Sequence, residues 1–252
     1  MRLADLTWPD IDSLNRDLPV LIPVAALEQH GRHMPVFTDS LLMGEVARRA
    51  EKVLGRHALF APLQWLGNSH HHLDFPGTLS AEPRLYLDLL CGLVENFLHH
   101  GFRRVLIING HGGNDVPGKQ AIFELRQRHR DRMDLLLLFA TYWHLAPGGH
   151  AAHPDLQQPE MGHAGEWETS MVLRLAPELV RDHRQAPDVP FGQGFEPASR
   201  GWTMRDRSEP GHIGRPALAT PEKGEALFEH FTSGLVRLVE RMEAWDGVTW
   251  DG

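Results

Sequence analysis

The sequence predicts an α/β fold built on a mostly parallel sheet that helices cover on both faces. Short apolar runs alternate with longer segments of helical pattern along all 252 residues. Helices of this length between strands imply crossover connections, which join parallel strands. No repeat or low-complexity linker interrupts the pattern, so we expect a single domain over residues 1–252.

Four strands and four helices carry this prediction. Apolar runs predict strands over residues 19–27, 58–63, 103–109 and 133–143. A first helix is expected over residues 40–55, with Ser40 as its N-cap and Gly55 as its end. A second, over residues 80–101, opens with Ser80, and a third runs through residues 119–130. The last helix starts at Thr220 and a following proline and runs toward residue 245.

Composition argues against several classes of protein. The formal charge is −8, and no run of Lys or Arg is dense enough to follow a phosphate backbone, so we expect no nucleic-acid partner. The first ten residues lack the apolar core of a signal peptide, and the longest aliphatic run, residues 135–138, is too short to cross a bilayer. The single cysteine, Cys91, excludes an intrachain disulfide and fits a cytoplasmic protein. Histidine is the unusual residue, at 17 copies.

A first polar cluster follows the strand predicted at residues 19–27. Glu28 and His30 are two residues apart, and in an extended segment their side chains share one face. A turn could bring Asp39 back to this pair, and His33 lies in the same turn. A solvated surface loop is the simpler interpretation for any one histidine, but it fits the group less well because a buried strand leads directly into it.

A second cluster, Asn109 to Asp115, follows the strand predicted at residues 103–109. His111 stands among three glycines, which allow close backbone approach and could point the imidazole into a crevice. A glycine-rich turn with an incidental histidine is the alternative. A phosphate-binding loop is a weaker one, because both the G-x-G-x-x-G spacing and a P-loop lysine are absent.

Two further clusters complete the set. Glu168 falls in the first turn of a helix, where a carboxylate could equally serve only to stabilise the helix N-terminus. The run from His70 to His72 lies in a loop, which we interpret as the mouth of a pocket or as plain surface. Since sites form at the carboxyl ends of parallel strands, all four clusters are expected on one rim of the sheet.

Imidazoles and carboxylates together suit zinc, manganese or iron, and no cysteine lies near these clusters. Glu28, Asp39 and Glu168 would carry three negative charges against the four positive charges of two divalent ions. A bridging hydroxide would balance the remainder, and one carboxylate commonly bridges such a pair. From the residues alone, a single ion stays an open alternative.

The motifs "LEQHGRHMPVFTD", "NGHGGN" and "HAGEWETS", with "FPGTLS" and a late "ATPEKGEAL", together resemble the creatininase family of metal-dependent amidohydrolases. The resemblance covers residues from about 20 to 240. It implies a three-layer α/β/α sandwich, a site for two divalent ions with zinc expected and manganese or iron as alternatives, and a homohexamer.

The resemblance also implies roles for single residues. Glu28, Asp39 and His111 would bind one metal, and His30 with Asp39 the other, so that Asp39 bridges the two. Glu168 is the expected fifth ligand, and His163 the residue that transfers a proton. The expected substrate-binding residues are Trp143, Asn109, Asn114 and His70.

Two departures concern the pocket. Gly113 stands where creatininases carry a glutamate, and the tryptophan that they carry shortly before the His163 position is missing. The sequence therefore predicts an amidohydrolase that opens a small cyclic or linear amide by a metal-bridging hydroxide. Hydrolysis of a formamide, lactone or short peptide is the alternative, and a non-catalytic metal-binding oligomer is a third.

Overall fold

The computed structural model describes residues 1–146, 148–192, 195 and 197–250. Its centre is a parallel sheet of four strands in the order β2-β1-β3-β4. The strands are β1 (Val20–Val24), β2 (Leu59–Phe60), β3 (Arg104–Asn109) and β4 (Leu136–Thr141). This order places β1 and β3 in the middle, where both of their faces are covered.

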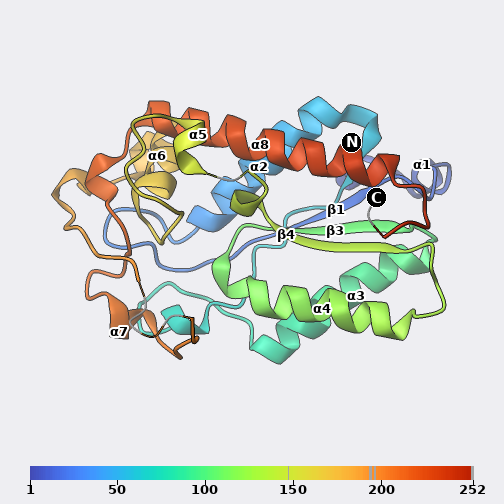
Figure 1. Cartoon of the computed structure of the whole chain (residues 1–252), viewed down its shortest axis with the longest axis horizontal. Helices are drawn as coiled ribbons and strands as arrows, with labels where there is room; N and C mark the ends of the chain where they lie inside the picture. The colour runs from blue at the N-terminus through green and yellow to red at the C-terminus, as the bar shows by residue number, and fades with distance from the viewer. Residues whose placement is uncertain (147, 193–194, 196, 251–252) are drawn as a thin grey trace.

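Helices form a layer on each side of the sheet (Figure 1). One layer holds α2 (Thr38–Leu54), α5 (Gly149–Ala152), α6 (Glu166–Leu175) and α8 (Pro221–Ala244). The other holds α3 (Pro83–His99) and α4 (Asp115–Arg128). The short helices α1 (Trp8–Asp12) and α7 (Met204–Arg207) lie at opposite ends of the molecule. The fold is therefore the predicted three-layer α/β/α sandwich.

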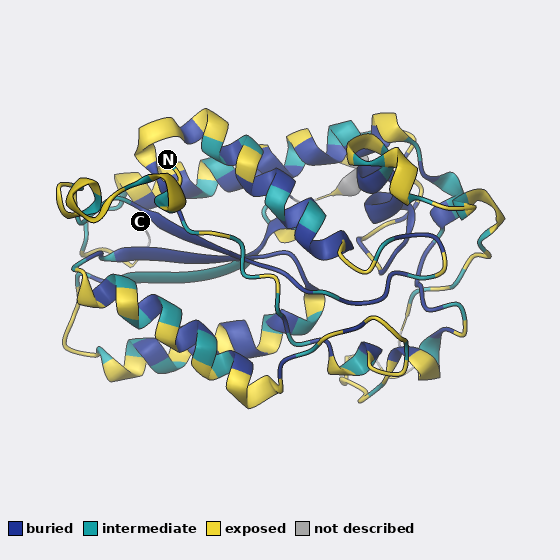
Figure 2. Ribbon diagram, turned by 180° about the vertical axis from the view of Figure 1, so that it is seen from behind, coloured by how far each residue is buried: buried dark blue, intermediate teal, exposed yellow. Residues whose placement is uncertain are grey.

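Alternation along the central strands explains why two cores form. In β1, Leu21 packs with the α2, α6 and α8 side, whereas Val20 and Ile22 pack with the α3 and α4 side. β3 divides in the same way, with Leu106 in the first core and Val105 in the second. Figure 2 shows both central strands buried, while β4, at the edge, is only partly covered.

Helix ends differ from the prediction where a predicted cap has another partner. α2 begins at Thr38, not at Ser40, because the Ser40 hydroxyl donates to the Ala26 carbonyl at 2.8 Å. The N-cap of α3 is Glu82, whose carboxylate accepts two backbone N–H groups of the first turn, not Ser80. Two predicted ends are confirmed: Gly55 follows α2 with φ 54°, and Thr220 caps α8.

No helix in the described part of the chain combines the length and apolar character that crossing a membrane requires.

Candidate metal centre

The polar clusters meet at the carboxyl ends of the strands, as the parallel topology predicts. Glu28 and His30 follow β1, and His111 follows β3. Asp39 lies in the first turn of α2 and Glu168 in the first turn of α6, so two helix N-termini point their carboxylates at the same place. Residues far apart in the sequence thus share one buried centre.

Asp39 lies at the middle of this centre. Its Oδ1 is 3.1 Å from His30 Nε2, and its Oδ2 is 2.9 Å from His111 Nδ1. On the His111 side, Glu28 Oε1 is 3.4 Å from the same Nδ1. On the His30 side, Glu168 Oε1 is 3.7 Å from Nε2. The centre therefore divides into two groups of three side chains that share Asp39.

These groups are buried without the partners that buried polar atoms normally have. Side-chain exposure is 6% or less for all five residues. Glu28 Oε2, His30 Nε2 and Asp39 Oδ2 make no hydrogen bond of acceptable geometry. An unpartnered buried polar atom costs about 1–3 kcal/mol. The three side chains that carry these atoms offer ligand atoms within 4.8 Å of one another, which is what a cation-binding site requires.

Backbone carbonyls fix the tautomers of the imidazoles. His30 Nδ1 lies 3.1 Å from the Glu28 carbonyl, and His111 Nε2 lies 3.0 Å from the Asn68 carbonyl. A carbonyl can only accept, so each of these nitrogens carries the proton and donates it. The other nitrogen of each ring faces the centre, and it would bind a metal through its lone pair once the metal has displaced its proton.

The pKa shifts show how strongly the charges interact. Burial alone would raise the pKa of Glu28, but the surrounding imidazoles, His111 first, outweigh it, and the pKa falls well below the usual carboxyl range. Burial would lower the pKa of His30, yet Asp39 and Glu168 raise it well above its usual value. Burial raises the pKa of Glu168. The carboxylates therefore favour positive charge on the neighbouring imidazoles. A divalent cation bound at the centre would provide that positive charge in place of the protons.

His163 lies against this centre but is held differently. Its Nε2 donates to the Gln29 carbonyl at 2.9 Å, and its Nδ1 is 3.5 Å from Glu28 Oε1. Its ring centroid is 4.4 Å from that of His30. Burial, reinforced by His30, lowers the pKa of His163 well below 6.5. The ring is therefore neutral near pH 7, with a free Nδ1.

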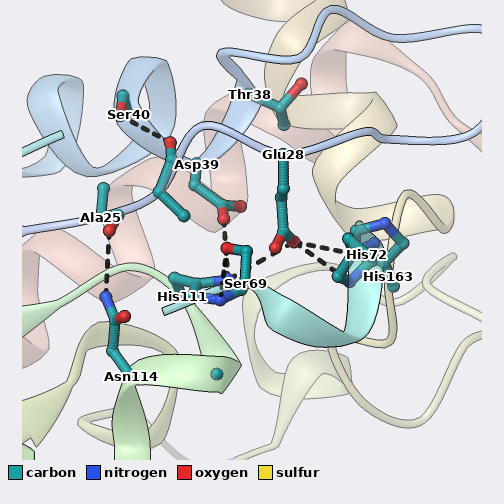
Figure 3. A network of polar contacts seen from close by, with 12 residues as sticks. Ala25, Glu28, Thr38, Asp39, Ser40, Ser69, His72, His111, Asn114 and His163 are labelled. Carbon is teal, nitrogen blue, oxygen red and sulfur yellow. Dashed lines mark hydrogen bonds and ion pairs between the residues drawn. The ribbon is translucent and has the colours of Figure 1, made fainter. Parts of the chain in front are cut away.

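Two side chains lie next to His163: His72, which the sequence placed only in a loop at the pocket mouth, and Gln29, which it did not single out. His72 is buried with its Nε2 3.5 Å from Glu28 Oε1, and its ring centroid is 4.4 Å from that of His163, with the two rings tilted by 46° (Figure 3). The Gln29 amide contacts His72 Nδ1 at 2.7 Å and donates to the Gly211 carbonyl at 2.8 Å. Gln29 lies between two singled-out residues, Glu28 and His30, which was the only sequence signal for its position.

A pocket of about 810 Å³ opens onto the centre. Trp143 lines it, as predicted, together with Glu28, His111, His163 and Glu168. His71, from the run interpreted as the pocket mouth, lines its outer part together with residues that the sequence did not single out, among them Glu160, Trp202 and Arg207.

Three predicted substrate-binding residues lie elsewhere. His70 is exposed and contacts the Ser80 hydroxyl at 2.7 Å. Asn109 donates to the His111 carbonyl at 2.6 Å and accepts from the His111 backbone N–H at 3.0 Å. Asn114 donates to the Ala25 carbonyl at 3.0 Å. Both asparagines shape the loop that carries His111, and none of the three lines the pocket.

Comparison with known proteins identifies the family of this chain. The family model of creatininase, described as creatinine amidohydrolase, matches residues 4–239. The chain belongs to the creatininase family. It is accordingly a creatininase-family hydrolase.

Similar proteins of this family have several names. The chain is 30% identical to the mycofactocin precursor peptide peptidase of Mycolicibacterium smegmatis, over 89% of this chain and 85% of that one. It is 27% identical to the creatinine amidohydrolase of Pseudomonas putida, over 92% and 94%. A crystal structure of creatinine amidohydrolase superposes with a TM-score of 0.81 at 27% identity, covering 95% of this chain and 96% of that chain.

Gly113 explains one departure from the creatininase pattern. A Cβ at this position would lie 2.3 Å from the Asn68 carbonyl oxygen and 2.4 Å from His111 Nε2. No side chain fits here unless the backbone moves, so a glutamate cannot serve the centre from this loop. Position 113 lies on the His111 side of the centre, and the carboxylate on the His30 side is that of Glu168, from α6.

Proposed function

We propose that this creatininase-family chain is a binuclear metal-dependent amidohydrolase that hydrolyses a small cyclic or linear amide C–N bond. The observation that carries the proposal is the position of Asp39, whose two oxygens each face a different imidazole. A carboxylate placed in this way could be shared by two divalent ions, one held beside each imidazole.

The donor set fits two such ions. Glu28, Asp39 and His111 would hold one, and His30, Asp39 and Glu168 the other. Nitrogen and carboxylate donors favour zinc, with manganese or iron also suited. Solved creatininases similar to this chain include a Zn–Zn form and a manganese form. The ions would supply an activated water and Lewis acidity toward the amide carbonyl.

His163 would move the proton. Its Nδ1 faces the centre in the neutral form, so it can take up a proton there and deliver it to the leaving nitrogen. The hydrogen bond to the backbone carbonyl of Gln29 keeps the proton of the neutral ring on Nε2. Trp143 forms part of the pocket wall against which the substrate would pack.

A short peptide is the second candidate substrate. Curated relatives similar to this chain include a peptide peptidase. The pocket volume of about 810 Å³ lies toward the upper end of the range for small-molecule sites, and it leaves room for more than a single small ring.

The test combines metal analysis with a substrate panel. We expect the purified protein to hold two equivalents of metal and to hydrolyse at least one of creatinine, formylated amines, lactams or acetylated di- and tripeptides. Asp39→Asn should lose both metal and turnover, because the amide cannot bridge two cations. His163→Ala should keep the metal and lose turnover.

A matched control lies in the same pocket. Glu160 lines the pocket but belongs to neither group of candidate ligands, so Glu160→Gln should retain both metal equivalents. Undiminished hydrolysis after exhaustive chelation, or full metal content in Asp39→Asn, would refute the proposal. Two bound metals without turnover of any substrate in the panel would favour a non-catalytic role.

A further inference from the structure

Arg207 presents a positive charge to the outer part of the pocket. It is the last residue of α7 and lines the same cavity as His111 and His163. Its guanidinium lies over the ring of Trp202, 4.9 Å from the centroid. A planar cation held against an indole face is fixed in orientation and keeps its edge N–H groups free to donate.

This guanidinium lacks a neutralising partner among the described residues. Its one hydrogen bond there is a long one, from Nη2 to the Gly192 carbonyl at 3.3 Å. Glu160 is close enough to favour its charge, but the two do not form an ion pair within the described part of the chain. Arg207 is half-buried, and burial lowers the pKa of its guanidinium. Cations withdrawn from water are normally paired, so this one favours an anionic ligand.

A line of rings connects Arg207 to the candidate metal centre. The His111 ring stacks on His71 at 5.8 Å, and His71 meets the edge of Trp202 at 5.0 Å. With the Arg207–Trp202 contact, three short steps lead from a candidate ligand to the guanidinium. An extended peptide advances about 3.3–3.6 Å per residue. A ligand could therefore place a carboxylate against Arg207 and an amide at the candidate metal centre. The two groups could be up to about four residues apart in an extended peptide.

From this arrangement we propose that the pocket binds amides bearing a carboxylate, which Arg207 receives through a paired hydrogen bond while the amide lies at the metal centre. The substrate class is thus an N-acylated amino acid or a short peptide with a free C-terminal carboxylate. The proposal rests on the proposed function for the position of the amide. It distinguishes this chain from an enzyme whose substrate is an uncharged lactam.

Binding can be measured separately from turnover. The probes are ketomethylene analogues of acetyl-Ala-Ala, which contain no amide at the scissile position, prepared with either a terminal carboxylate or a terminal carboxamide. By calorimetry on the Zn²⁺-loaded protein, we expect the carboxylate to bind about 10- to 100-fold more tightly, as for a charge-assisted hydrogen-bonded pair.

Three variants at two positions of α7 provide the comparison. Arg207→Met should remove the preference by weakening only the carboxylate, and Arg207→Lys should retain part of it. Arg205 is also on α7 but contacts the Phe75 ring and lines a different cavity, so Arg205→Met should leave the preference unchanged. Circular dichroism and thermal melting of each variant confirm that it is folded.

Each outcome has one meaning. Equal binding of the two probes, no binding of either, or a preference that survives in Arg207→Met overturns the inference; survival would mean that the metal centre itself holds the carboxylate. The corresponding amides then test the proposed function. An Arg207-dependent preference without hydrolysis leaves the inference intact and refutes the amidohydrolase. Equal hydrolysis of the substrates with a terminal carboxylate and a terminal carboxamide would support the amidohydrolase and refute the role of Arg207.

Discussion

The buried ion pair between Lys223 and Glu166 offers a direct test of how α8 holds the candidate centre. Lys223 Nζ lies 2.6 Å from Glu166 Oε1, and the two side chains are 8% and 0% exposed. The other carboxylate oxygen accepts the backbone N–H groups of Gln157 and Gln158. Glu166 is two residues before Glu168 in the first turn of α6, so the pair secures the helix that carries a candidate ligand.

Lys223→Met should leave the buried Glu166 carboxylate without its counter-ion. Removing one partner of a buried pair costs about 3–5 kcal/mol in free energy of unfolding. For a chain of this size, about 1 kcal/mol shifts the melting temperature by about 2–4 °C, so we expect a decrease of about 6–20 °C. Calorimetric melting at neutral pH measures it directly.

The double variant Lys223→Met with Glu166→Gln removes both charges and should recover most of that loss. An exposed pair is the control. Arg32 and Glu209 lie 2.7 Å apart, but each is 74% exposed, and Arg32→Met should cost less than about 1 kcal/mol. A Lys223→Met protein that melts within 2 °C of the parent, or a double variant no more stable than the single one, would refute the reasoning.

Three other changes test the loops around the centre. Gly113→Ala should weaken metal binding measured by dialysis and elemental analysis, because its Cβ would displace His111; unchanged metal content would contradict this. Gln29→Leu should cost about 1–3 kcal/mol in urea unfolding, since it leaves the buried His72 ring and the Gly31 backbone N–H without their side-chain partner. Burial lowers the pKa of His33 from 6.5 to about 4, so between these values the unfolded chain binds more protons than the folded one. The stability contributed by neutral His33 is present above pH 6.5 and is lost as the pH falls toward 4, and His33→Gln should make urea unfolding less sensitive to acid across that window.

The fold could be predicted because its signals are local. Apolar runs of strand length between helical segments define a parallel sheet, and that sheet determines which loops meet. Helix starts were less predictable, since a serine such as Ser40 or Ser80 can bond to a neighbouring loop instead of its own helix. That choice depends on what packs beside it, which the local sequence does not record.

The same distinction applies to the site. Glu28, His30, Asp39 and His111 stand out because each follows or begins a predicted element, and the structure brings them together with Glu168. The histidine run was misjudged at the level of single residues: one turn of 3-10 helix over His70–His72 turns His72 inward and leaves His70 exposed. Arg207 had no sequence signal at all, because its importance comes from Trp202 beneath it and from the pocket that it faces.

The distribution of candidate ligands along the chain has a consequence for biosynthesis. Four of the five lie between Glu28 and His111 and leave the ribosome well before Glu168. The helix α6, which carries Glu168, is packed in turn against α8 near the end of the described chain. A growing polypeptide would therefore display most of a metal-binding surface while lacking the element that closes it. The order of synthesis itself would delay the acquisition of a tightly held pair of ions until translation is nearly complete.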